Sequence, residues 1–402
     1  MNEHRLEVAD VLRTCGDDFL ARWGHVLSRE QRKACDDIRA CRTAALGGHV
    51  DQCDQCGHCV ISYNSCRNRS CPKCQAVARA KWLTEREAEL LPIEQYFHVV
   101  FTLPQQIAVL ALQNARRIYS ILFQSVAETL LTIAADPQHL GAAIGFLAVL
   151  HTWGQNLHFH PHIHCVVPGG GISPDNSRWI DCRKSFFLPV QVLSCLFRKR
   201  LLIHLRKAFQ RGKLQFHGEL KPLAQPSAFD ALCDQSGEIK WVVYAKPPFG
   251  GPGQVLKYLA RYTHRVAISN RRLISLTDGR VTFEWKDYAD GNQIKTMTLE
   301  AVEFIRRFLL HVLPSGFVHL RHYGFLANRY REEKLALCHF LLTARPSATA
   351  ISASSSGLVG TTTAEEIRQR CPICKAGRMI VIQVLSAAAL AWLTEPLVVN
   401  TS

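Results

Sequence analysis

The sequence lacks the features of a secreted or membrane-spanning protein. Residues 1–5 lead into a mixed, charged segment instead of the apolar stretch that a secretory signal carries. An apolar stretch near the other end, residues 379–393, is shorter than the roughly 20 residues that a helix needs to cross a bilayer. We therefore expect a cytoplasmic protein with no membrane partner.

Negative charge is also scarce. The 402 residues contain 33 Asp and Glu against 48 Lys and Arg, which gives a net charge of +15 at pH 7. Such an excess of positive charge favours a polyanionic partner, and nucleic acid is the first candidate. A basic soluble protein without such a partner is the alternative that composition leaves open.

Cysteine is abundant, with 16 residues. In a reducing compartment, cysteines in this number indicate metal ligation more than disulfides. Two Cys-x-x-Cys pairs, Cys53 with Cys56 and Cys71 with Cys74, are separated by fourteen residues, a spacing typical of a four-thiolate zinc ribbon. Four neighbouring side chains could replace one of these ligands: His49, His58, Cys59 and Cys66.

The predicted zinc ribbon has its own positive charges, Arg67, Arg69 and Lys73. Four thiolates leave no open coordination position, so we expect this module to hold DNA phosphates and not to catalyse. The alternative is a purely structural module. A further pair, Cys371 and Cys374, joins Cys338 or the N-terminal cluster, or is an unpaired half-site.

The remaining pattern predicts an α+β protein. Residues 1–46 have a helical pattern, with Ser28 as an N-cap. We predict strands at 96–104, 144–153 and 294–299, a hairpin of 266–276 and 281–288 around Asp278-Gly279, and helices at 105–135, 189–211 and 300–312. This order predicts an antiparallel or mixed sheet flanked by helices.

Two histidines converge on one predicted strand. Pro161 cannot donate to a sheet ladder, so we start this strand at His162 and end it at the glycines 169–171. Alternate strand residues share a face, which brings the imidazoles of His162 and His164 side by side. They form half of a metal site. Two histidines alone do not determine whether the metal is zinc, manganese, magnesium or iron.

Two tyrosines lie four residues apart in a predicted helix, residues 254–265. Tyr258 and Tyr262 therefore share one helix face. They alternate with basic residues, which makes a buried aromatic stripe less probable than a site that acts on phosphate. The basic side chains that we expect to contact the DNA backbone are Lys257, Arg261, Arg265, Arg271 and Arg272.

Taken in order, these motifs resemble the two-tyrosine HUH transposases of the insertion sequence 91 family. The resemblance covers most of the chain and lies in residues 65–75, 98–104, 160–164 and 258–270. It implies an HUH endonuclease-like sheet, largely antiparallel and of the ferredoxin or RRM type. The implied domains are 1–90 (helical segment and zinc-binding domain), 91–335 (catalytic domain) and 336–402 (linker and C-terminal tail).

The resemblance also implies a function. Tyr258 or Tyr262 would nick single-stranded element ends and rejoin them to target DNA through 5′-phosphotyrosine intermediates, in rolling-circle-like transposition at the nucleoid. His162 and His164 would hold a catalytic magnesium or manganese ion, and zinc would be structural. The third ligand is open among His98, His151, His160 and His264, with His98 or His264 in the first place.

Two other functions stay open from the sequence. A replication initiator of a plasmid or phage would use the same chemistry for a different outcome. A non-enzymatic zinc-finger regulator would bind DNA but would leave His162, His164, Tyr258 and Tyr262 without a shared role. The oligomeric state cannot be inferred from these residues.

Overall fold

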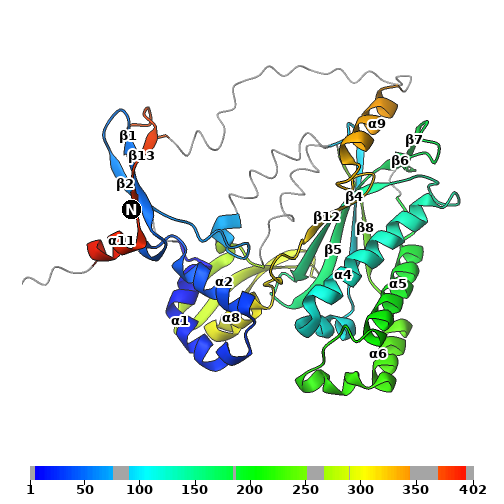
Figure 1. Cartoon of the computed structure of the whole chain (residues 1–402), viewed down its shortest axis with the longest axis horizontal. Coiled ribbons are helices and arrows are strands. Elements are labelled where there is room, and N and C mark those ends of the chain that lie inside the picture. The colour runs from blue at the N-terminus through cyan, green and yellow to red at the C-terminus, as the bar shows by residue number, and fades with distance from the viewer. Residues whose placement is uncertain are drawn as a thin grey trace, which may run out of the picture.

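The computed structural model describes residues 5–75, 90–183, 187–250, 267–288, 290–344 and 370–394. Figure 1 shows a large sheet covered by helices, a second body that contains the N-terminal helices, and a small sheet beside it. The described strand pairs are all antiparallel. The prediction of an α+β protein with a mainly antiparallel sheet is therefore confirmed.

The large sheet has five strands in the order β12-β4-β5-β3-β8. The strands are β3 (Gln95–Thr102), β4 (Gly145–Trp153), β5 (Phe159–Pro168), β8 (Val243–Gly250) and β12 (Leu320–Gly324). The three inner strands are rich in β-branched and aromatic residues and bury most of their side chains. They form the rigid base of the candidate site.

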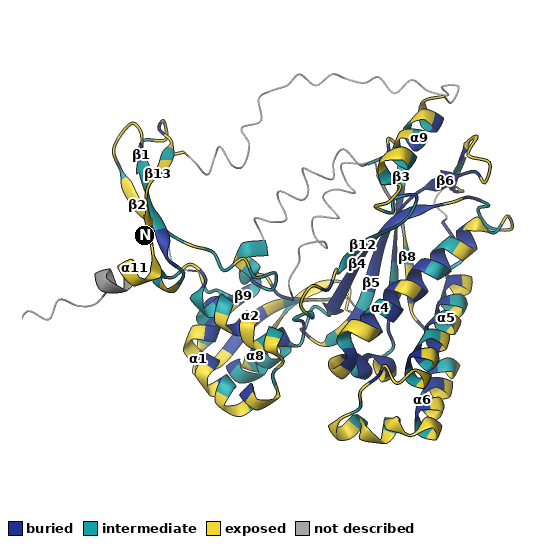
Figure 2. Cartoon of the chain, in the orientation of Figure 1, coloured by how far each residue is buried: buried dark blue, intermediate teal, exposed yellow. Residues whose placement is uncertain are grey.

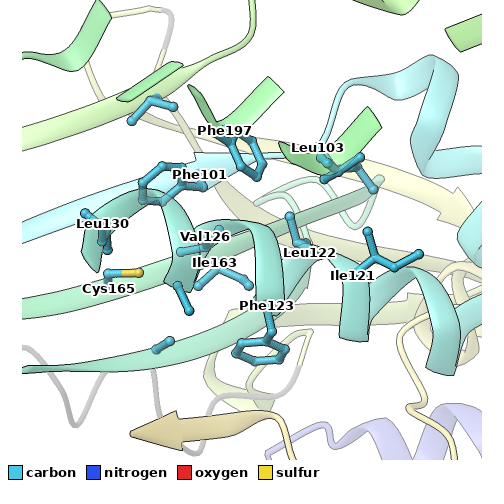
Figure 3. Close-up of a cluster of buried hydrophobic side chains, with 14 of the residues drawn as sticks. Phe101, Leu103, Ile121, Leu122, Phe123, Val126, Leu130, Ile163, Cys165 and Phe197 are labelled. Atoms are coloured by element: carbon cyan, nitrogen blue, oxygen red, sulfur yellow. The ribbon is translucent and has the colours of Figure 1, made fainter. Parts of the chain in front are cut away.

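One face of this sheet carries the main hydrophobic core. The helices α4 (Gln105–Ala135), α5 (Val190–Gln210) and α6 (Pro226–Glu238) cover it (Figures 1 and 2). Figure 3 shows Phe101 and Ile163 of the sheet facing this helical layer, and the Phe101 ring meets that of Phe197 edge to face at 5.1 Å. Alternation along each strand then turns the intervening residues to the opposite face.

Helix α4 has the length and apolar composition of a membrane-crossing helix, but 67% of its most apolar window is buried. Burial in the main core explains this composition. The opposite face of the sheet has a smaller apolar cluster around Tyr96, Leu147 and Val166. A hairpin of β6 (Gly170–Ile172) and β7 (Trp179–Asp181) and helix α9 (Arg331–Thr343) share another small core.

The second body joins the N-terminal helices to a chain segment that lies between β8 and β12 in the sequence. Its elements are α1 (Val8–Trp23), α2 (Arg29–Ala40), β9 (Leu273–Thr277), β10 (Arg280–Asp287), β11 (Gln293–Glu300) and α8 (Ala301–Leu309). Its core contains Phe19, Phe283 and Phe304. Ser28 is the N-cap of α2, as predicted, because its hydroxyl accepts a hydrogen bond from the Gln31 backbone N–H at 3.2 Å.

The small sheet has the order β13-β1-β2 and is built from both ends of the chain. Strands β1 (Gly48–Cys53) and β2 (Cys59–Tyr63) form a hairpin, and β13 (Met379–Leu385) adds to the free edge of β1. Helix α11 (Ala387–Thr394) follows β13. Figure 1 shows β1 and β13 side by side although most of the chain separates them in sequence.

Two predicted strand starts are wrong. Strand β5 begins at Phe159, three residues earlier than expected, because Pro161 lies opposite the register shift between His151 and Trp153, where no ladder N–H is needed. The hairpin strand predicted from residue 266 begins only at Leu273, after a 3-10 turn (Asn270–Arg272).

The predicted hairpin turn is confirmed. Asp278 and Gly279 both have positive φ, 49° and 69°, as a tight turn between antiparallel strands requires. The other short 3-10 segments are Gly24–Val26, Ala44–Leu46 and Gly218–Ala224. None of them carries a candidate site residue.

Candidate functional site

Three imidazoles meet on the face of the large sheet opposite helices α4, α5 and α6. His162 and His164 lie on β5, and His151 of β4 is the cross-strand partner of His162. One ring nitrogen of each lies within 4.8 Å of the others. The sheet therefore completes the half-site predicted from His162 and His164 with a third histidine from the neighbouring strand.

Hydrogen bonds to the imidazole rings orient the lone pairs of His162 and His164 toward each other. Nδ1 of His162 lies 2.6 Å from the His160 carbonyl oxygen and must be the protonated nitrogen, which donates this bond. Its Nε2 then faces Nε2 of His164 at 3.0 Å. If two nitrogen atoms bind one metal ion at about 2.1 Å each, and the nitrogen–metal–nitrogen angle is about 90°, the two nitrogens lie about 3.0 Å apart. The donor set therefore fits a divalent ion.

His98 has a supporting position instead of a ligand position. Its Nε2 lies 2.8 Å from Nδ1 of His164, on the side of that ring away from His162. A ligating histidine commonly bonds through its other nitrogen to such a partner, which fixes its tautomer. The group of three imidazoles that could hold an ion therefore contains His151 in the place where His98 was expected. His264, the other expected ligand, lies outside the described residues.

Burial keeps these rings neutral. Desolvation lowers the pKa of His162 to about 4 and that of His98 to about 3, and it lowers the pKa of His164 well below its usual value. The positive charge of Lys246 lowers the pKa of His98 further. Only a neutral imidazole offers a lone pair to a metal, so this environment holds His162 and His164 in the ligating form near pH 7.

The tyrosine segment lies outside the described residues. This holds for Tyr258, Tyr262, Lys257, Arg261 and Arg265. Their roles therefore stay predictions. The described chain on either side of them ends at Gly250 of β8 and resumes at 267.

The cysteines form two clusters, and this corrects the predicted zinc ribbon. Among the described residues, Cys41, Cys66, Cys71 and Cys74 form one group, and Cys53, Cys56, Cys371 and Cys374 form another. The two predicted pairs therefore belong to different clusters. The reason is topological, since the β1–β2 hairpin carries Cys53 and Cys56 away from Cys71 and toward the C-terminal pair.

Both clusters have the chemistry of a structural zinc site. In the first, Sγ of Cys74 lies 3.7 Å from that of Cys41 and 3.6 Å from that of Cys66. Cys41 and Cys71 are buried in the core of the second body, so this cluster anchors the N-terminal helices. A four-thiolate donor set leaves no open coordination position, so a zinc ion held by the first cluster would be structural.

Of the five predicted DNA contacts that are described, two guanidinium groups have structural partners. Arg69 donates to the carbonyl oxygens of Phe317, Leu313 and Pro314 at 2.8, 2.7 and 2.6 Å. Arg272 donates to the carbonyl oxygens of Glu284 and Gln155 and lies over the Phe283 ring. We reassign both to holding the parts of the protein together.

The other three basic side chains lie closer to solvent. Arg67 and Arg271 are exposed, so their positions are compatible with phosphate contacts. Lys73 forms a 2.9 Å ion pair with Glu7 of the N-terminal segment. An exposed pair of this kind contributes little to stability and leaves the ammonium group accessible.

The sequence predicts an incomplete ligand set. It offers His151 as one of four candidates for the third ligand, because His151 lies on the strand before the histidine motif. Cys41 has no Cys-x-x-Cys partner and gave no signal. Cys371 and Cys374 form a Cys-x-x-Cys motif, which predicts two metal ligands. The spacing of this motif does not determine which other cysteine pair completes the site.

Comparisons with known proteins agree with this architecture. The family described as "Transposase zinc-binding domain" matches residues 11–103, and the family described as "Putative transposase" matches residues 145–334. The chain is similar to "Putative transposase y4qJ" of Sinorhizobium fredii, with 57% identity over 381 residues, 94% of this chain and 95% of that protein.

A more distant relative is the "Transposase for insertion sequence element IS801" of Pseudomonas savastanoi pv. phaseolicola. It is 28% identical over 318 residues, which cover 76% of this chain and 74% of the relative. No solved structure matches the chain. The two family matches and the extent of the similarity show that this chain belongs to the insertion sequence 91 family of transposases.

Proposed function

We propose that this transposase nicks and rejoins single-stranded element ends through 5′-phosphotyrosine intermediates, in rolling-circle-like transposition. The observation that carries the proposal is the convergence of His151, His162 and His164 on the face of the large sheet opposite helices α4, α5 and α6. We also assign the large antiparallel sheet to the HUH endonuclease class, because its neighbouring inner strands β4 and β5 carry these imidazoles.

The chemistry would proceed by two transesterifications. The hydroxyl oxygen of Tyr258 or Tyr262 attacks the scissile phosphorus, and the 3′ oxygen of the neighbouring nucleotide leaves and takes up a proton. The phosphate ester is kept as a tyrosine link, so rejoining to a 3′-hydroxyl needs no energy from ATP. Bound magnesium or manganese would neutralise charge on the phosphate oxygens and favour the phenolate.

The described flanks support a position of the tyrosines at this face. Strand β8, which precedes them, pairs with β3 and turns Tyr244 and Lys246 toward the same face as His98. After them, Ala267 lines a small cavity together with Trp153, whose indole stacks on His151 at 4.4 Å. The described chain therefore lies near the histidine cluster on both sides of the tyrosine segment, at β8 beside His98 before it and at Ala267 near Trp153 after it.

The proposal is tested by a cleavage assay with a labelled single strand that carries the element end. With manganese or magnesium, we expect protein covalently linked to the 5′ side of the cut. Changing both Tyr258→Phe and Tyr262→Phe should abolish the adduct while DNA binding survives.

Tyr244→Phe is the matched control, because Tyr244 is a 51% exposed tyrosine on the same sheet face. This variant should retain the adduct. Normal cutting by the double variant would show that another group is the nucleophile. A regulator that binds DNA without cutting it would give no adduct with any variant.

A further inference from the structure

We propose that Cys53, Cys56, Cys371 and Cys374 bind a second zinc ion, and that this ion fastens the C-terminal segment to the zinc-binding domain. Neither family match covers this site as a whole, since one ends at residue 103 and the other at residue 334. The inference does not depend on the chemistry proposed for the tyrosines.

The sulfur geometry fits a tetrahedral ion. Sγ of Cys53 lies 3.6 Å from Sγ of Cys374, and Sγ of Cys56 lies 3.6 Å from Sγ of Cys371. Thiolates bound to zinc at about 2.3 Å lie about 3.8 Å from each other. A disulfide would require about 2.05 Å. The four sulfur atoms therefore have the spacing of metal ligands.

The two Cys-x-x-Cys pairs also have the same backbone turn. The N–H of Gly57 donates to the Cys53 carbonyl at 3.1 Å, and the N–H of Lys375 donates to the Cys371 carbonyl at 3.0 Å. The residue after each second cysteine has positive φ, 70° at Gly57 and 59° at Lys375. A left-handed lysine is uncommon, so its occurrence at this position indicates a turn that the site requires.

Backbone N–H groups point at the sulfur atoms. The N–H of Cys56 lies 3.5 Å from Sγ of Cys53, and the N–H of Gly377 lies 3.3 Å from Sγ of Cys374. Such donors support the negative charge of thiolates and orient them. A Cβ at Gly377 would collide with Sγ of Cys53, so the close approach of the two chain segments requires glycine there.

The surrounding sheet has little core to hold it together. The side chains of Ile380, Val381, Ile382 and Val384 on β13 are exposed, and among the described residues of β13 and α11 only Leu385 and Leu390 are buried apolar side chains. A module with so little buried apolar surface needs a metal or another covalent constraint for stability. The ion would therefore hold β13 in place on β1.

This site has a consequence for assembly. Its two halves lie on either side of residues 57–370, so the C-terminal half must be synthesised before the site can form. The first cluster, in contrast, uses residues 41–74 only. We therefore expect the zinc-binding domain to fold first around the ion of the first cluster. The second ion binds only after the C-terminal cysteines have been synthesised.

Metal analysis of the purified full chain tests the proposal. We expect two zinc ions per chain. The pairs Cys53→Ser with Cys56→Ser, and Cys371→Ser with Cys374→Ser, should each lose one ion, and the fourfold variant should also lose only one. Cys59→Ser, an exposed thiol on β2 of the same small sheet, is the control and should keep two.

A loss of two ions in the fourfold variant would show that the pairs bind separately and would overturn the shared site. An unchanged zinc content in the Cys371 and Cys374 variant, or iron in place of zinc, would overturn it as well. These outcomes are independent of DNA cleavage.

A second measurement avoids variants that fail to fold. A protease site placed between residues 350 and 351 of the otherwise unchanged chain allows the C-terminal fragment to be cut free after folding. We expect the fragment to stay bound during gel filtration, to be released by a chelator and to rebind when zinc is added. Retention of the fragment after complete zinc removal would contradict the proposal.

Discussion

Nε2 of His98 lies 2.8 Å from Nδ1 of His164, while the other nitrogen of the His164 ring faces His162 at 3.0 Å. When Nδ1 of His164 donates to His98, the Nε2 lone pair of His164 points toward His162, where a shared cation would bind. His98 is a positioning residue, because it acts on the candidate site through the ring of His164.

His98→Ala should weaken manganese binding by roughly 10–100-fold, because the support of a ligating imidazole is lost. His98→Gln should lose less, since its amide oxygen can accept the same hydrogen bond. Calorimetric titration of the metal-depleted protein with manganese measures both values. Equal binding by the wild type and His98→Ala would refute the positioning role.

Acid should destabilise the protein through the same histidines. Their pKa values are lower in the folded chain than the usual 6.5, at about 4 for His162 and about 3 for His98. Between these values and pH 6.5, the unfolded chain binds more protons, so the free energy of unfolding decreases as the pH falls. The expected slope is about 1.4 kcal/mol per pH unit for each such histidine.

Urea unfolding at several pH values between 7 and 4, without added manganese or magnesium, measures this slope. The loss of cysteine ligands to protons affects the wild type and a histidine variant alike, so the difference between them isolates the imidazoles. His98→Gln should show a shallower decrease than the wild type. Parallel decreases would show that the buried rings do not titrate in this range.

Arg69 should matter for stability. Its guanidinium joins the loop between Cys66 and Cys71 of the first cysteine cluster to three carbonyl groups between residues 313 and 317. Arg69→Ala removes these charged donors and leaves the acceptors without them, which should lower the free energy of unfolding by about 1.5–3 kcal/mol. Denaturant unfolding measures the change, and a shift within about 0.5 kcal/mol would contradict the structural assignment.

Arg67, two residues earlier, should behave in the opposite way. Its side chain is exposed, so Arg67→Ala should leave the stability nearly unchanged. If it contacts a phosphate, its removal weakens DNA binding and lowers the slope of log affinity against log salt by about 1. Filter binding over a range of salt concentrations, with Arg69→Ala as the paired variant, measures this difference.

The parts of the site that follow from local chemistry were predictable from the sequence. Strand alternation placed His162 and His164 on one face, and the Asp278-Gly279 pair marked the hairpin turn. The third imidazole required the register of β4 against β5, which shifts at the bulge opposite Pro161. No pattern within a single strand determines that register.

The division of the cysteines was not predictable for a related reason. Cys-x-x-Cys pairs are interchangeable half-sites, and their partners depend on which strands pair. Strand β13 adds to β1 from the far end of the chain and brings Cys371 and Cys374 to Cys53 and Cys56. Cys71 and Cys74 then take Cys41 and Cys66, which belong to no pair in the sequence.

The proposed mechanism requires that a tyrosine in residues 254–265 becomes linked to DNA beside the three histidines. Nuclease digestion of the covalent complex, followed by mass spectrometry of its peptides, locates the attached nucleotide. We predict that the nucleotide lies on Tyr258 or Tyr262 and that His151→Ala strongly reduces the amount of complex. A nucleotide on Tyr244 or on a serine, or an undiminished complex in His151→Ala, would contradict the account.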